Sequence, residues 1–206
     1  MFLIILQVPF LGLLIDSKIS WVPQILNVKA KLAKCTSVLF KAKHLVDLST
    51  MKLLYNSLFL PYIDYCSEVW GNTYVTKLNC IILLQKRAIR IVANVSKYYH
   101  TNELFKQLKL LKFLDHVKFK SGVFMYNAYH FKLPTKLQLL FNKGSNSQHC
   151  TRQHNKFKVF YKRTNIKALC VSSKGTSLWN SLPTSIINSS SLTVFKQKLK
   201  KYLMRY

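Results

Sequence analysis

The chain has 206 residues and half of them are apolar, so it can form one large domain or two small ones around a packed core. Its 32 Lys and Arg residues face six Asp and Glu, which gives a formal net charge of +26 and excludes a balanced, self-neutralising surface. A surface with this excess of positive charge repels itself unless a polyanion neutralises it. Nucleic acid is the first partner to expect, and an anionic membrane surface is the second.

The acidic residues are confined to the first 115 positions, and no carboxylate side chain occurs from His116 to Tyr206. The lysines of the C-terminal part therefore lack internal counter-ions, which favours contact with a polyanion over a merely solvated surface. The five cysteines are scattered and form no Cys-x-x-Cys pair. This usage is typical of a reducing compartment, so we expect an intracellular protein, nuclear or cytoplasmic.

The N-terminal 15 residues are almost wholly apolar, but Gln7, Pro9 and Gly12 interrupt them and they are too few for a helix that spans a membrane. No positive charge precedes them and no small-residue cleavage site follows, so a signal peptide is not expected. Residues 10–16 are short, apolar and bounded by a polar turn. This pattern predicts a strand buried on both faces.

Helical periodicity dominates the next 120 residues and predicts a mainly α fold. Ser49 is expected to cap the second helix, and Pro61 to kink or break it because proline donates no hydrogen bond and clashes one turn back. Thr101 is expected to cap a short helix that ends near Lys109. The remaining segments expected to be helical are 24–44, 76–94, 112–130 and a turn over 134–141.

Residues 142–155 are polar and predict a linker. In 156–162 lysines alternate with apolar residues, which predicts a half-exposed strand with 168–172 as its antiparallel partner in a small C-terminal β-hairpin. A short helix over 174–182 should end at Pro183. The serine run 189–191 should cap a last amphipathic helix, whose apolar side we expect to dock onto the rest of the domain.

No catalytic or metal-binding constellation is expected. The six carboxylates are dispersed, whereas two-metal phosphoryl transfer needs them clustered, and only Asp64 and Glu68 share a helix face. The one close Cys/His group, His149, Cys150 and His154, supplies three of the four ligands that zinc requires. Five glycines form no phosphate-binding loop. We therefore predict no catalytic residue, no metal and no cofactor.

Basic residues interleaved with aromatics remain as the candidate chemistry. Lysine and arginine supply salt-dependent phosphate contacts, and exposed aromatics stack on unpaired bases. In the C-terminal strand the candidate phosphate contacts are Lys156, Lys158, Lys162 and Arg163. Phe160, on the lysine side of that strand, is the candidate stacking residue. Lys86 and Arg90 form a like-charge pair four residues apart, a repulsion that a bound phosphate backbone would reverse.

Several segments resemble reverse transcriptases of jockey-like and CR1-like non-LTR retrotransposons. FLGLLIDSKISW (10–21) resembles the segment that leaves their palm, and LYNSLFLPYIDYCSEVWG (54–71) and LQKRAIRIV (84–92) resemble successive thumb helices. KGTSLWNSLP (174–183) followed by FKQKLK (195–200) is similar to their C-terminal signature. The likeness runs from about residue 10 to the end of the chain.

The resemblance implies a thumb that holds template and primer, with Lys86, Arg87 and Arg90 contacting the nucleic-acid backbone. It divides the chain into a remnant of the palm edge strand (1–21), a helical thumb-like domain (22–141), the linker (142–155) and a basic C-terminal subdomain (156–206). The Asp-Asp motif of the palm is absent, so the expected function is a catalytically incomplete fragment that binds template–primer. The missing palm of the same element is the second expected partner. The alternatives are a stand-alone nucleic-acid or chromatin binder, a membrane-surface protein, and a relic without function.

Overall fold

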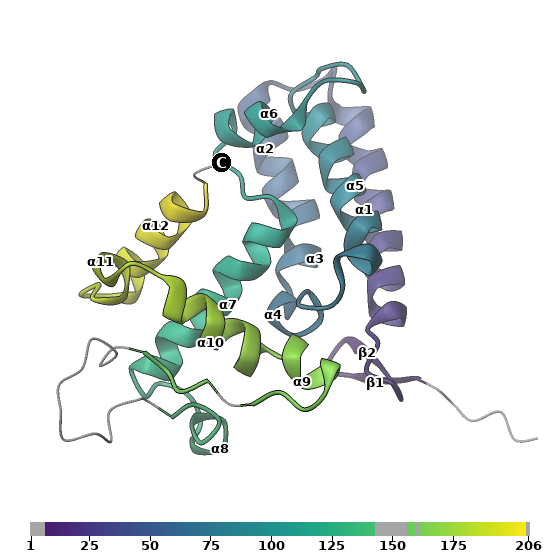
Figure 1. Cartoon of the computed structure of the whole chain (residues 1–206). Helices are drawn as coiled ribbons and strands as arrows, with labels where there is room; N and C mark the ends of the chain where they lie inside the picture. The colour runs from purple at the N-terminus through teal and green to yellow at the C-terminus, as the bar shows by residue number, and fades with distance from the viewer. Residues whose placement is uncertain (1–6, 143–155, 160, 205–206) are drawn as a thin grey trace, which may run out of the picture. The chain divides into compact units, whose positions relative to one another are not determined.

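A computed structural model describes residues 7–142, 156–159 and 161–204 of the chain. It divides into two compact units, unit 1 (Met1–Phe113) and unit 2 (Leu114–Tyr206). The described residues are mainly helical with one two-stranded antiparallel sheet, which confirms the predicted fold class (Figure 1). The division between the units falls at the start of a long helix and differs from the expected boundaries. Most of the expected linker, residues 143–155, lies outside the described residues.

Unit 1 opens with a β-hairpin in place of the single buried strand that we predicted. Strands β1 (Gln7–Phe10) and β2 (Leu13–Asp16) pair antiparallel, with Phe10 opposite Leu13. Leu11 and Gly12 both have positive φ, 45° and 79°, which is the backbone of a tight two-residue hairpin turn. The chain therefore reverses near the start of the predicted strand. Of the eight strand residues only Leu13 is buried.

Two contacts hold this hairpin to the helices of unit 1. The buried Gln24 side chain accepts a hydrogen bond from Leu14 N at 3.0 Å, and the Tyr65 hydroxyl donates to Leu11 O at 2.5 Å. After β2 the Asp16 carboxylate accepts from the backbone N–H groups of Ser20 and Trp21 at 2.9–3.0 Å. Burial raises the pKa of Asp16, but these hydrogen bonds outweigh it and the net pKa is lowered.

Helix α1 (Val22–Ala42) follows, close to the predicted range. The next helical segment runs through α2 (Leu48–Leu54), a π-helical turn η1 (Tyr55–Phe59) and α3 (Leu60–Asp64). Pro61 lies in the first turn of α3, just after the wider π-turn, which Leu60 N closes by donating to Tyr55 O. The helical backbone continues through this proline to Asp64, so Pro61 does not break it. The predicted cap at Ser49 is wrong, because Asp47 accepts from the N–H groups of Ser49 and Thr50 at 3.3 Å.

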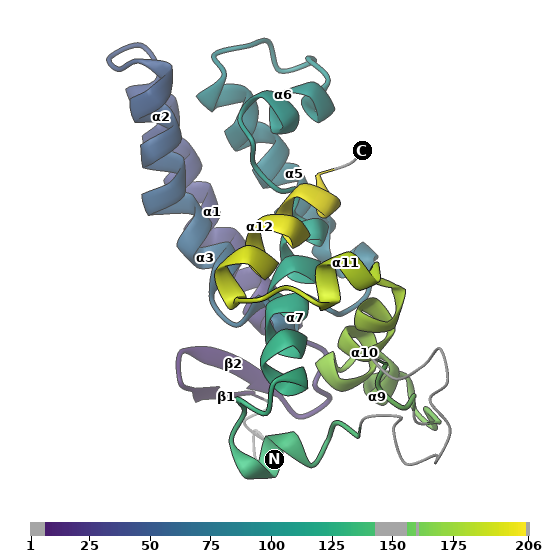
Figure 2. The same cartoon turned by 90° about the vertical axis from the view of Figure 1, so that its left-hand side faces the viewer.

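The remaining helices of unit 1 are α4 (Ser67–Trp70), α5 (Val75–Val92) and α6 (Thr101–Gln107). The predicted cap at Thr101 is wrong by one residue, because His100 occupies the N-cap and Thr101 begins the helix. Helices α1 and α5 run side by side in the same direction, as Figures 1 and 2 show. Near their starts, Lys77 Nζ donates to Ser20 O at 3.2 Å.

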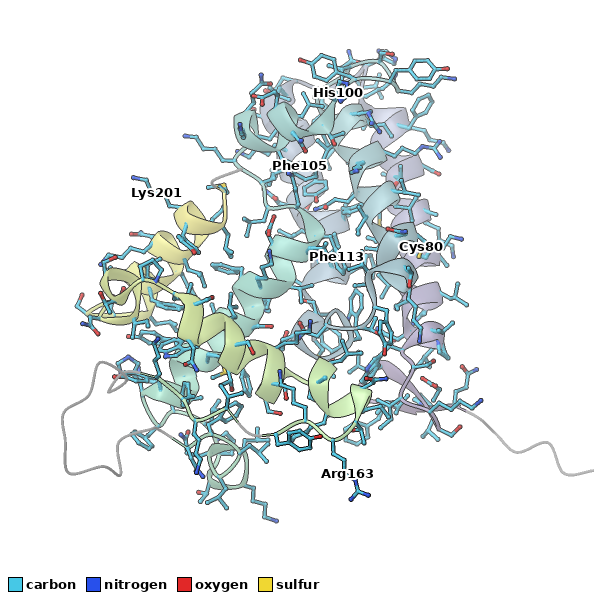
Figure 3. All side chains as sticks on the ribbon, in the orientation of Figure 1. Cys80, His100, Phe105, Phe113, Arg163 and Lys201 are labelled. Carbon is cyan, nitrogen blue, oxygen red and sulfur yellow. The ribbon has the colours of Figure 1, made fainter. Side chains whose placement is uncertain are left out.

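A buried glutamine joins α5 to two other segments of unit 1. The Gln85 amide nitrogen donates to the Tyr55 hydroxyl and to Leu111 O, both at 3.0 Å, and its oxygen accepts from Phe113 N at 2.7 Å. The ring of Phe113 stacks on Trp70 with centroids 5.7 Å apart. Figure 3 shows Phe105 and Phe113 among the helices of this unit, and both are buried. The core around α5 thus contains one hydrogen-bonded polar side chain, Gln85, together with buried aromatic rings.

Unit 2 is built around the long helix α7 (Phe113–Tyr129). The other described helices are α8 (Thr135–Gln138), α9 (Asn165–Leu169), α10 (Val171–Ser181), α11 (Thr184–Ile187) and α12 (Leu192–Leu203). Ring contacts of 4.6–5.8 Å link Tyr126 of α7 to Phe195 of α12, Tyr129 to Trp179 of α10, and Trp179 to Phe195. Figure 2 shows these helices together, so the predicted docking of the last amphipathic helix is confirmed.

The predicted C-terminal hairpin does not form. Residues 165–169 and 171–181 are helical, so the expected partner strand at 168–172 does not exist. The extended backbone at Phe157 instead pairs with a side chain: Phe157 N donates to Asn180 Oδ1 at 3.0 Å, and Asn180 Nδ2 donates to Phe157 O at 2.9 Å. Only Phe157 of the expected apolar face is buried, whereas Val159 and Tyr161 are 55% and 92% exposed.

Candidate nucleic-acid interface

The C-terminal ends of α1 and α5 and the loop after α5 enclose a pocket of about 650 Å³ in unit 1, which we call the basic pocket. Its lining combines four cationic side chains with three apolar ones and one hydroxyl, and contains no carboxylate. The lining residues are Phe40, Lys43, Arg87, Arg90, Ile91, Val95, Ser96 and Lys97. Positive charge and apolar surface therefore meet in one concave place.

The end of α5 determines where the loop part of this pocket lies. Asn94 adopts the left-handed conformation with φ 48°. Asn94 N donates to Ile91 O and Val95 N donates to Arg90 O, both at 3.1 Å, which is the Schellman pattern of helix termination. Asparagine tolerates the left-handed region better than most residues because its short polar side chain bonds locally. The reversal turns Val95, Ser96 and Lys97 back alongside the last turn of α5.

The two arginines of α5 differ in how they are held. Arg90 is half-buried and its Nε donates to Tyr99 O at 2.8 Å, so this side chain fastens the loop to the helix. Its two terminal nitrogens are separate from that bond. Arg87, one turn earlier, is exposed. As a candidate phosphate ligand, Arg87 is therefore the more readily reoriented side chain, and Arg90 is the more pre-organised one.

Exposed aromatic rings accompany the lysines of the basic pocket. Lys43 Nζ lies 4.7 Å from the centroid of the Phe40 ring, and Lys97 Nζ lies 4.9 Å from that of Tyr98. Phe40 is 53% exposed and Tyr98 is 78% exposed, so both rings keep a free face in unit 1. Basic residues beside accessible aromatic faces are the combination that single-stranded nucleic acid recognises.

The electrostatic balance of the basic pocket stays positive after the helix dipoles are included. Two helices end here, and each C-terminus carries roughly −0.5 elementary charge, about −1 together. The four cations Lys43, Arg87, Arg90 and Lys97 outweigh this by about three charges. Part of the cationic charge stabilises the helix ends, and the remainder is available to an anion.

Two of the three thumb candidates lie in this pocket. Arg87 and Arg90 line it, whereas Lys86 is half-buried on an adjoining face of α5 and does not. Sequence reasoning missed Phe40, Lys43 and Lys97. The first two could have been noticed as an aromatic and a lysine three apart at the end of a predicted helix. Lys97 carried no local signal, because its position depends on the reversal at Asn94.

The C-terminal candidates belong to unit 2. Lys156, Lys158 and Arg163 are exposed and Lys162 is half-buried. Figure 3 shows the Arg163 side chain extending away from the backbone. Phe160, the proposed stacking residue, lies outside the described residues. The period-two arrangement that would have aligned these side chains on one strand face is absent.

Among the described residues no three His, Cys, Asp or Glu side chains are grouped so that they could hold a metal ion. His149, Cys150 and His154 lie outside these residues. No helix in the described ranges is both long and apolar enough to cross a membrane.

The basic pocket thus offers four cationic side chains and no carboxylate to a ligand. The chain matches no family among models of known protein families, no curated protein and no solved structure.

Proposed function

We propose that unit 1 binds the phosphate backbone of nucleic acid through the basic pocket. One observation carries this proposal: four cationic side chains from three segments of the chain converge on one pocket whose lining has no carboxylate. Lysine and arginine bind phosphates without reading sequence, and they release condensed counter-ions when they do so. Binding that weakens steeply with salt and has little sequence preference is the expected behaviour.

The resemblance of 54–71 and 84–92 to thumb helices supplies the biological setting of the proposal. In that setting the chain is the thumb and C-terminal part of a non-LTR retrotransposon reverse transcriptase, and the pocket holds template–primer. The polymerase chemistry is not proposed for this stretch, because its carboxylates lie far apart in the sequence and the Asp-Asp motif is absent from it. A stand-alone nucleic-acid binder would use the same pocket in the same way.

The test is a salt titration with the full chain and a fluorescein-labelled 20-base-pair RNA–DNA hybrid. Fluorescence anisotropy gives Kd between about 50 and 300 mM KCl for the wild type and for the triple variant K43Q/R87Q/K97Q. Each lost phosphate contact should reduce the slope of log K against log salt by about 0.9, so the variant should lose about 2–3 from the slope. Arg90 is left in place because its bond to Tyr99 O holds the loop.

A matched control separates the basic pocket from general charge. K18Q/K29Q/K34Q removes the same number of positive charges, three, from exposed positions of unit 1 that do not line the pocket. It should retain most of the slope and affinity, since diffuse surface charges are largely screened beyond about 10 Å at 0.1 M salt. Equal losses in the two triple variants would contradict a localised interface, and undetectable binding of the wild type at low salt would end the proposal.

A further inference from the structure

The basic pocket has a property that contact with a regular duplex does not require: it is concave and partly apolar. A phosphate backbone is an exposed ridge, and lysines on a convex surface are enough to bind it. Here Phe40, Ile91 and Val95 contribute apolar surface beside the four cations, and the volume of about 650 Å³ falls within the range of pockets that hold small organic ligands. An occupant that uses this lining needs both a negative charge and a flat apolar part.

We infer that the basic pocket binds an unpaired nucleotide, with its base stacked on Phe40 and its phosphate held by Arg87, Arg90 and Lys97. This inference rests on the proposed function and specifies its ligand as a single-stranded overhang or end rather than the duplex itself. A nucleotide combines a planar base with a phosphate in one ligand, which matches the two kinds of lining. A base within a duplex presents its faces only to its neighbours and cannot reach a recessed ring.

The exposed face of Phe40 makes it the stacking surface. The ring lies on the last turns of α1, is 53% exposed, and shares the pocket lining with all four cations. A phenylalanine on a rigid helix loses little side-chain entropy when a base covers it. Lys43, 4.7 Å from the ring centroid, is placed to move from the ring to a phosphate when the base arrives.

Chain geometry keeps the phosphate ligands close to that ring. Arg90 is tied to Tyr99 O, and Lys97 follows the helix reversal at Asn94, so both are fixed relative to the end of α5. Because every base has an aromatic face, stacking of this kind tolerates any sequence. The site is therefore expected to distinguish unpaired from paired nucleotides, and not one base from another.

The experiment compares two probes that differ only in an overhang. A blunt RNA–DNA hybrid and the same hybrid with a three-nucleotide single-stranded extension are titrated with the full chain at about 100 mM KCl, with Kd read from fluorescence anisotropy. The wild type should prefer the extended probe. Phe40→Leu should weaken binding of the extended probe by roughly 5- to 150-fold and leave the blunt probe unchanged, because it removes stacking and keeps an apolar side chain of similar size.

Tyr62→Leu is the matched control. Tyr62 is another exposed aromatic of unit 1 with a lysine over its ring, Lys31 at 5.5 Å, and it does not line the basic pocket. This variant should bind both probes as the wild type does. The inference is overturned if Phe40→Leu affects neither probe, or both equally, while K43Q/R87Q/K97Q still weakens binding; the proposed function then stands alone. If the wild type binds neither probe, the proposed function itself has failed.

Discussion

The polar contact at the centre of unit 1 leads to the prediction that the structure supports in most detail. Gln85 is 2% exposed, and its amide makes three hydrogen bonds, to the Tyr55 hydroxyl, Leu111 O and Phe113 N. The amide can satisfy Leu111 O and Phe113 N together in only one orientation, since one partner accepts and the other donates. We predict that Gln85→Met, which keeps the length of the side chain, destabilises unit 1 severely.

The magnitude follows from counting these bonds. Each is worth about 0.5–1.5 kcal/mol net, and a buried backbone group left without a partner costs about 1–3 kcal/mol, so losing all three should cost about 3–5 kcal/mol. Tyr55→Phe removes only one bond and should cost about 1 kcal/mol. Burial raises the pKa of Tyr55 far above its usual range, so its hydroxyl stays neutral at any practical pH. The double variant should cost less than the sum of the two.

Urea unfolding followed by tryptophan fluorescence measures the free energy, and hydrogen exchange of the peptide 75–92 assigns the loss to α5. Lys86→Met introduces the same residue at the next position of the same helix, where the side chain is half-buried and outside this network. Its free energy of unfolding should stay within about 0.5 kcal/mol of the wild type. A cost below about 1 kcal/mol for Gln85→Met would refute the reasoning.

Three further outcomes are expected. Lys109 closes α6 with φ 55°, so Lys109→Gly should raise stability by about 0.5–1 kcal/mol in urea unfolding, whereas Gln107→Gly, at a helical position, should lower it by a similar amount. Hydrogen bonds from Ser49 and Thr50 lower the pKa of Asp47 to about 2, below the unfolded value of about 3.9. The stability it supplies is therefore present above about pH 4 and lost toward pH 2, and Asp47→Asn should flatten that fall in thermal unfolding. Raising the KCl concentration should increase the unfolding temperature, because salt screens the repulsion between positive charges, and it should weaken nucleic-acid binding. A decrease in the unfolding temperature would contradict the view that this repulsion destabilises the fold.

Most of the longer helices could be predicted from the sequence. The ranges expected for α1, α5, α7 and α10 agree with the structure to within a few residues, because an apolar stripe every three to four residues has few alternatives over such lengths. Two short segments, residues 10–16 and 156–162, were misjudged. Over 156–162 the alternation of lysine with apolar residues matched a strand. At Phe157, however, one hydrogen bond to the Asn180 side chain and one from it take the place of a partner strand. Composition alone does not reveal such a partner.

The candidate interface was predictable only in part for a related reason. Arg87 and Arg90 belong to one helix, and their spacing is visible in the sequence. Phe40 and Lys43 lie more than 40 residues earlier, and they join the arginines because α1 and α5 run in the same direction and end together. Lys97 joins because Asn94 reverses the chain. Periodicity states which face of a helix is buried, but neither which helix is its neighbour nor the direction in which that neighbour runs.

The charge of the chain acts on folding and on binding with opposite signs. Unit 2 contains 17 Lys and Arg against the single carboxylate of Asp115, which pairs with Lys118 at 2.9 Å. A single partly exposed ion pair stabilises little, so the cohesion of unit 2 must come from its buried rings, among them Trp179 and Phe195, which are fully buried. A bound polyanion would relieve the repulsion that these rings now oppose. Under the proposed function, the same excess charge that weakens the free protein strengthens its complex with nucleic acid, so added salt should change stability and binding in opposite directions.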